Sequence, residues 1–121
     1  MFQISYLQGM SSRFWSYAPP AAGITNSTAD VAVKAAVVGE RNYVASLQVA
    51  VSVVLANVTT LVVKSNTTVL ARIPVNTAVG PMPPVNFDPP LRGGVNEAIN
   101  IAAETIFATG NLLVNAQGYQ A

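Results

Sequence analysis

Residues 43–53 read YVASLQVAVSV, and this stretch decides the fold class. Every second residue from Tyr43 to Val53 is apolar, and the polar residues Ser46, Gln48 and Ser52 all stand at the positions in between. Successive side chains of a β-strand point to opposite faces, so a period of two marks a strand with one buried face. The stretch therefore predicts a half-buried β-strand.

Further strands are predicted on both sides of this one. Residues 61–64 (LVVK) and 69–73 (VLARI) flank a short polar turn centred on Asn66, which is the spacing of a β-hairpin. Alternation returns at 112–117, giving a last strand that ends near Tyr119. Residues 75–91 are crowded with proline, which lacks an amide donor, and are therefore predicted as loop and edge strand.

Two readings fit residues 95–107. Apolar residues there follow a helical i, i+3, i+4 stripe that stops at Gly110, and periodicity mildly favours that helix. A strand with Ile99 and Ile101 facing inwards and Asn100 facing outwards is the alternative, and it completes an all-β domain. With several short strands and frequent turns, the leading fold class is all-β: a β-sandwich or jelly-roll-like domain with an extended N-terminal arm.

The arm is predicted from composition. Five of the nine aromatic residues lie in the first seventeen positions, and Pro19, Pro20 and Gly23 then interrupt regular structure. We therefore divide the chain into an arm and Pro/Gly hinge, 1–28, and a β-sandwich domain, 29–121. The alternative is that the aromatic segment forms a strand that closes the same core. If it is an arm that binds a neighbour, deleting residues 1–17 abolishes that binding and leaves a folded domain.

Charge is scarce along the whole chain. Six Lys or Arg and five Asp or Glu are the only charged residues among 121, or 9%, against roughly 25% in ordinary soluble domains. A net charge of +1 provides little repulsion between copies. We therefore expect subunit contacts to cover part of the surface, as in a homo-oligomer, with a trimer favoured.

The residues available for chemistry are few. Histidine and cysteine are both absent, which excludes thiolate and imidazole nucleophiles and most metal sites, so we expect no enzyme activity, no cofactor and no metal. A paired-carboxylate hydrolase needs two acids that face each other across a substrate. Glu97 and Glu104 are seven residues apart and would share one helical face if 95–107 were a helix. The simpler reading is two solvated charges.

Nucleic acid and membrane are not expected partners. The six cations are scattered and nearly balanced by carboxylates, which does not make a basic patch. The first residues lack the pattern of a secretory signal, and the longest apolar run is too short for a membrane helix. The glycines after Arg92 could form a small anion nest, but we expect a tight strand-entry turn in which Arg92 pairs with a carboxylate or a subunit carbonyl.

An interaction surface is the best functional candidate that remains. The N-terminal segment combines Arg, Trp and Tyr, which often dominate interface energies, and an extended segment can add to a neighbour's sheet. A sugar-binding platform is a further option, because exposed aromatic faces stack on sugars. The candidate interface residues are Phe2, Tyr6, Arg13, Phe14, Trp15, Tyr17 and Arg92.

Several strings of the sequence resemble a group of small virion proteins of tailed bacteriophages. They are 15–17 (WSY), 23–28 (GITNST), 33–36 (VKAA), 41–44 (RNYV), 47–49 (LQV), 90–94 (PLRGG) and 114–121 (VNAQGYQA). The proline-rich residues 74–84 depart from that pattern. The resemblance implies a structural protein of the virion, assembled in the host cytoplasm, and it tilts residues 99–102 towards a strand.

From this resemblance we expect a head decoration or cement protein that binds the major capsid protein or other virion proteins and stabilises the assembled capsid. A protein that binds the assembled lattice better than free subunits would stabilise it by linkage. The alternative is a tail or fibre component, or a glycan-binding module for host recognition.

Overall fold

A computed structural model describes residues 13–121, and within that range the chain is built from strands without a helix. The strands are β1 (Phe14–Tyr17), β2 (Ile24–Thr25), β3 (Val31–Lys34), β4 (Arg41–Val53), β5 (Thr59–Ser65), β6 (Thr68–Val75), β7 (Gly80–Pro81), β8 (Val85–Val95), β9 (Ile99–Ala103) and β10 (Asn111–Gln120). No segment of 13–121 forms a helix long and apolar enough to cross a membrane.

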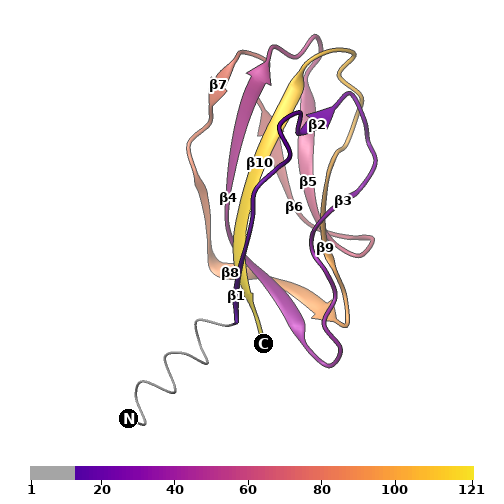
Figure 1. Ribbon diagram of the computed structural model, residues 1–121, viewed down its shortest axis with the longest axis vertical. Coiled ribbons are helices and arrows are strands. Elements are labelled where there is room, and N and C mark those ends of the chain that lie inside the picture. Colours follow the sequence, from indigo (N-terminus) through magenta and orange to yellow (C-terminus); the bar gives the residue numbers. More distant parts are fainter. Residues whose placement is uncertain (1–12) are drawn as a thin grey trace.

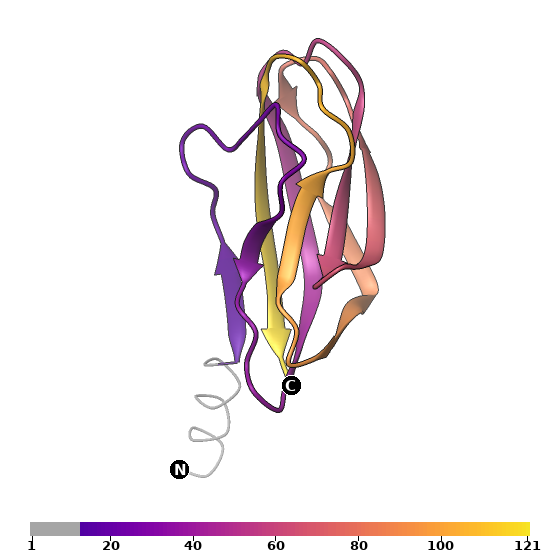
Figure 2. The same ribbon diagram turned by 90° about the vertical axis from the view of Figure 1, so that its right-hand side faces the viewer.

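The strands form two antiparallel sheets that pack face to face, so the predicted all-β sandwich is confirmed (Figure 1, Figure 2). The six-stranded sheet has the order β1-β10-β4-β7, with β2 also paired to β10 and β8 also paired to β4. The four-stranded sheet has the order β3-β9-β5-β6. The long strands β4 and β10 lie side by side in the middle of the larger sheet, and they contain the predicted strands at 43–53 and 112–117.

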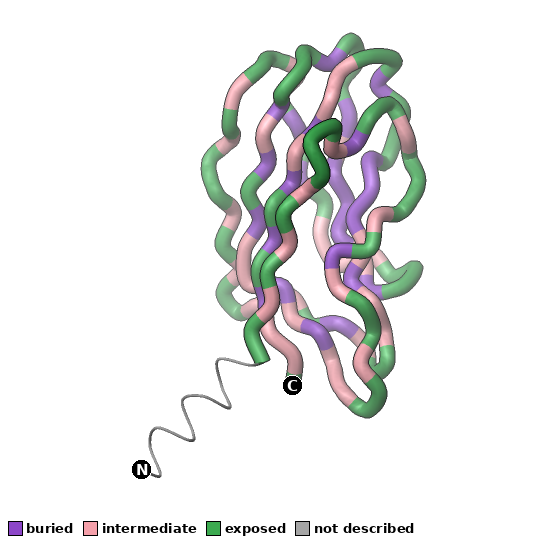
Figure 3. The backbone as a smooth tube through the Cα atoms, viewed as in Figure 1, coloured by how far each residue is buried: buried purple, intermediate pink, exposed green. Residues whose placement is uncertain are grey.

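The core lies between the two sheets, as the buried segments of Figure 3 show. The larger sheet contributes Val44, Leu47, Val49 and Val51 from β4, and the smaller sheet contributes β5 and β9 side chains such as Leu61 and Ile101. Phe107, which follows β9, is fully buried and fills one end of this core. Burial of these side chains supplies the main driving force for folding.

Residues 99–103 form a strand, so the helical reading of 95–107 is wrong and the alternative is confirmed. β9 is paired on both sides, with β3 and with β5, and Ile99 and Ile101 are buried as the strand reading requires. The pairing of two neighbouring strands outweighs the weak local helical periodicity. The predicted hairpin is also present: β5 and β6 meet at a turn in which Asn66 has a φ of 50°.

The N-terminal segment is corrected in part. β1 pairs along its whole length with β10, and Trp15 and Tyr17 pack against the core, so this stretch is the strand that closes the sandwich. β2 also pairs with β10. Residues 13–28 thus belong to the domain assigned to 29–121. The backbone of β1 pairs with the edge of β10, and its inward-facing aromatic side chains pack on the core. Phe2 and Tyr6 lie outside the described residues.

The predicted turn at 91–94 is wrong. Leu91, Arg92, Gly93 and Gly94 lie inside β8, an edge strand that pairs with β4. Position 93 favours glycine because the backbone of β4 passes close to it: a Cβ here would stand 2.6 Å from the carbonyl oxygen of Asn42. The expectation of an edge strand in the proline-rich region is confirmed.

Candidate functional site

A row of aromatic side chains crosses the outer face of the six-stranded sheet. In register, Phe14 of β1 stands opposite Tyr119 of β10, and Tyr119 stands opposite Tyr43 of β4. The rings of Phe14 and Tyr119 meet edge to face with centroids 6.3 Å apart, and those of Tyr119 and Tyr43 stack at 4.8 Å. We call Phe14, Tyr119 and Tyr43 the aromatic row. Both geometries are favourable for aromatic pairs.

A β-bulge places Tyr43 in this row. Gln117 pairs with Ser46 and the next residue, Gly118, pairs with Val44, so Ala45 is an extra residue in β4. The extra residue reverses the alternation: Val44 is buried, whereas Tyr43 faces outwards with Tyr119. The alternation in the sequence predicts that Tyr43 lies on the same face as Leu47 and Val49. This prediction is wrong, because the extra residue Ala45 shifts Tyr43 to the opposite face.

Polar side chains cover the outer face next to the aromatic row. In the next outward-facing row, Ser16, Gln117, Ser46 and Asn86 lie opposite one another, and Asn115 pairs with Gln48 in the row beyond. We call these six residues the polar rows. None of them makes a side-chain hydrogen bond to another residue of 13–121, so their amide and hydroxyl groups are available to a ligand.

Open hollows lie between these side chains. One of about 380 Å³ is bounded by Phe14 and Tyr119 on its aromatic side and by Ser16 and Gln117 on its polar side, with the bulge residue Ala45 also lining it. Phe14 is 60% exposed. A second hollow of about 200 Å³ continues over the polar rows beside Gln48, Asn86 and Asn115. Together they form one shallow site with an aromatic wall and a polar floor.

The structure separates the interface residues that the sequence suggested. Phe14 joins the aromatic row, whereas Trp15 and Tyr17 alternate to the inner face and pack on the core. Arg13 donates to the carbonyl oxygen of Gln120 and forms an ion pair with Glu40 at 3.2 Å. Arg92 lies exposed on β8 opposite Tyr43. Tyr43, Tyr119 and the polar rows were not predicted. The alternation of Asn115, Gln117 and Tyr119 with the apolar residues of the last strand was the available signal for one outward-facing set.

Most carboxylates of the described chain have structural partners. Asp30 pairs with Lys64 at 2.9 Å, and Glu104 pairs with Arg72 at 2.9 Å. Glu97 accepts a hydrogen bond from the Ser65 hydroxyl at 2.6 Å. Glu97 and Glu104 flank β9 at its opposite ends, so they do not form the pair that a helix would have made. No group of three acidic residues that could hold a metal occurs within 13–121.

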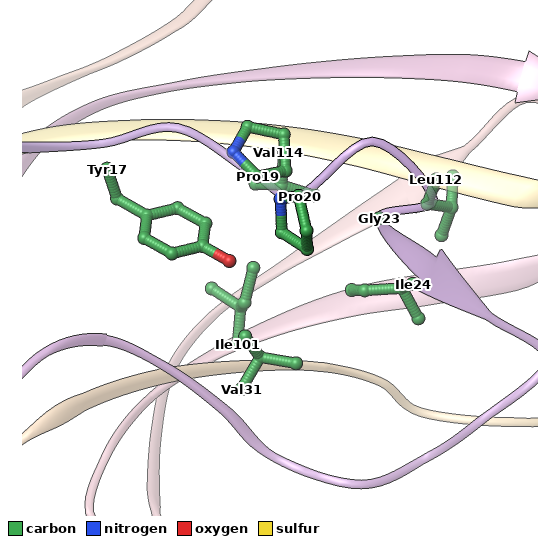
Figure 4. A pocket seen from close by; sticks show the side chains of 9 residues that line it. All are labelled: Tyr17, Pro19, Pro20, Gly23, Ile24, Val31, Ile101, Leu112 and Val114. Atoms are coloured by element: carbon green, nitrogen blue, oxygen red, sulfur yellow. The ribbon is translucent and has the colours of Figure 1, made fainter.

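An apolar cavity of about 60 Å³ lies between the two sheets, beside β1 and the loop that follows it (Figure 4). It is lined by aliphatic and proline side chains, including Pro20, Ile24 and Ile101, and Tyr17 contributes the one side-chain hydroxyl. In Figure 4 this hydroxyl points towards the middle of the lining residues. The cavity offers packing space and no charged group, so it is a feature of the core.

One end of the sandwich is apolar. Three loops meet there through backbone hydrogen bonds from Leu55 to Thr77 and from Asn57 to Phe107. The exposed apolar side chains of these loops form what we call the apolar end: Val54, Val58, Val79 and Ile106. The one charged residue in the three loops is Glu104, which is held by Arg72.

Comparison with known proteins gave no match to any protein-family model and none to a curated protein. Among solved structures, the chain is similar to the family 32 carbohydrate-binding module of C. perfringens NanJ in complex with galactose, with 16% identity, a TM-score of 0.47 and coverage of 89% of this chain and 96% of that one. It is also similar to the C-terminal domain of EclA, a sugar-binding protein, with 9% identity, a TM-score of 0.47 and coverage of 90% and 77%. At this level of similarity, sugar binding is a property of those two proteins alone.

Proposed function

We propose that this chain is a non-enzymatic binding module that recognises glycans through the outer face of its six-stranded sheet. The observation that carries the proposal is the aromatic row beside the polar rows, on one exposed face and around one hollow. Ligand sites typically combine apolar and aromatic walls with a few polar groups that fix orientation. This face has that composition.

The chemistry of a sugar ring matches these two kinds of group. One face of a pyranose presents C–H groups, which pack on an aromatic ring, and its rim presents hydroxyls, which both donate and accept hydrogen bonds. In the larger hollow, Phe14 provides the ring, and Gln117 and Ser16 provide amide and hydroxyl groups. Because the face is open, we expect modest affinity that depends on several sugar units.

The test is a glycan array followed by titration calorimetry with the best ligand. Replacing Phe14 by Ala should weaken binding about tenfold, equivalent to about 1.4 kcal/mol, and Gln117→Ala should weaken it by a smaller factor. Both side chains are exposed, so folding should be retained. Ile106→Ala is the matched control, because Ile106 is equally exposed but lies at the apolar end.

Two results would contradict the proposal. The first is silence of the folded protein on the array. The second is binding that Ile106→Ala weakens as much as Phe14→Ala does.

A structural role in a virion is the second candidate, and the apolar end favours it. Four large aliphatic side chains are exposed there beside a single paired carboxylate, in a chain with 9% charged residues. Such surfaces commonly mark protein contacts. We propose that, in this role, the apolar end contacts a capsid or other virion protein, or another copy of the chain.

Particle binding tests this second candidate. Substituting Val58, Val79 and Ile106 together by Ser should reduce co-sedimentation with purified capsids while Phe14→Ala leaves it unchanged. The opposite pattern, or no binding of the unmodified protein to any virion component, would count against the virion role.

A further inference from the structure

Arg92 of β8 lies next to Tyr43 in the same cross-strand row, so a positive charge stands at the end of the aromatic row. Its side chain is exposed. Arg13, Lys64 and Arg72 each have a carboxylate partner, whereas no described carboxylate lies within ion-pair distance of Arg92. A guanidinium is always charged near neutral pH and offers five donors, so Arg92 is an unused anion-binding group next to the proposed sugar site.

A second arginine lies beside it. Arg41 precedes Tyr43 by two residues on β4, and its Nη1 donates to the carbonyl oxygen of Gly93 at 3.0 Å. This bond fixes the guanidinium and leaves other N–H groups without a described partner. Arg41 and Arg92 line one open hollow of about 330 Å³ where β8 meets the four-stranded sheet, which contributes Ser65 of β5 and Thr68 and Leu70 of β6.

The charges around this hollow favour an anion. Glu97 is its one carboxylate, and an oxygen of that group is occupied by the Ser65 hydroxyl. Asp88 stands on β8 in the stretch that has no partner in β4, and it does not line the hollow. Two guanidinium groups therefore face one carboxylate, which leaves an excess of positive charge in this hollow. Arg92 connects the hollow to the aromatic row, because it stands opposite Tyr43.

We infer that the ligand is an anionic glycan, whose carboxylate or sulfate groups are bound by Arg92 and Arg41 while its sugar rings occupy the aromatic row and the polar rows. This rests on the proposed glycan-binding function and names the class of glycan. Guanidinium groups pair with planar carboxylates in bidentate geometry and also bind tetrahedral oxyanions. From Phe14 to Arg92 the row crosses three strand spacings, about 14 Å. An oligosaccharide is therefore needed to contact both ends.

The test uses the whole chain and ligands that differ only in charge. Affinity is measured by calorimetry for oligogalacturonate, for its neutral methyl ester and for a sulfated galactan oligosaccharide. We expect at least one anionic ligand to bind about fivefold or more tightly than the methyl ester, with the advantage falling as salt is added. The two anionic ligands distinguish carboxylate from sulfate recognition.

The variant Arg92→Gln should weaken binding of the anionic ligands more than binding of the methyl ester, with Arg41 left as the second anion-binding group. It removes no described contact, so folding is expected to be unchanged. Lys34→Gln is the control, because it removes the same charge from β3 in the other sheet and should keep the preference. Arg41→Gln should reduce the preference and also loses the bond to Gly93.

The outcomes separate the two proposals. Equal binding of acid and methyl ester by the unmodified protein, or equal loss for both ligands in Arg92→Gln, would overturn the anionic preference while glycan binding stands. If the array and all three oligosaccharides give no binding, both proposals fail.

Discussion

The indole ring of Trp15 lies on the backbone of Gly118, at the place where any other residue would carry its Cβ. A Cβ built on Gly118 would stand 2.5 Å from Cζ2 of Trp15, and it would also collide with the carbonyl oxygen of Tyr43. The contact fastens β1 to β10 on the inner face, directly behind the aromatic row. The packing of Trp15 on Gly118 thus supports both the pairing of β1 with β10 and the position of Phe14 and Tyr119 on the outer face.

Substituting Gly118 by Ala should therefore destabilise the domain. Overpacking costs typically 1–3 kcal/mol, and here a backbone oxygen cannot move away, so we expect the free energy of unfolding to fall by about 2 kcal/mol. Denaturation followed by far-UV circular dichroism measures it. The neighbouring exposed substitution Gln117→Ala should change stability by less than about 0.5 kcal/mol. Equal stability of the two variants would show that Gly118 is not tightly packed.

The apolar ring and the N–H group of Trp15 should contribute to stability with opposite sign. Its Nε1 is buried and has no hydrogen-bond partner in the described structure, so the indole N–H contributes a desolvation cost. Trp15→Phe removes that group but keeps most of the apolar area, and should lower the free energy of unfolding by less than about 1 kcal/mol. Trp15→Ala should cost about 3 kcal/mol by loss of packing. A loss for Trp15→Phe as large as that for Trp15→Ala would contradict the ranking and point to a hydrogen-bond partner for the N–H.

Ser65 and Glu104 should respond very differently to substitution. Ser65 is buried, donates to Glu97 and accepts from the amide of Gly94 at 2.8 Å, so Ser65→Ala leaves that amide without its partner. We expect a loss of about 2 kcal/mol in the free energy of unfolding. Glu104→Gln breaks an exposed ion pair with Arg72 and should cost less than about 0.5 kcal/mol. Comparable losses in urea titrations of the two variants would contradict this ranking.

The position of β1 changes what truncation is expected to do. A chain that begins at residue 13 keeps every described contact and is the reference for shorter chains. A chain that begins at residue 18 loses Trp15 and Tyr17 from the core edge and the pairing of β1 with β10, and should be markedly less stable. Calorimetric melting of both truncations tests this. A fully stable chain from residue 18 would restore the reading of 1–17 as a separate arm.

Local patterns fixed the class of fold. Alternation in 43–53 and 112–117, the turn at Asn66 and the prolines of the edge region each depend on neighbours in sequence, because side-chain direction and turn geometry are local properties of the backbone. They were sufficient to predict strands and a sandwich. Absence of histidine and cysteine likewise limited the chemistry directly.

Tertiary structure alone decided the strand at 99–103, the place of β1 and the composition of the outer face. Pairing of β9 between β3 and β5 outweighed its helical pattern, and the bulge at Ala45 arises from register with β10, which no local pattern encodes. That single extra residue turned Tyr43 outwards to stack on Tyr119. A strand reverses its faces with every one-residue shift, so which side chains meet on a sheet is determined by non-local pairing.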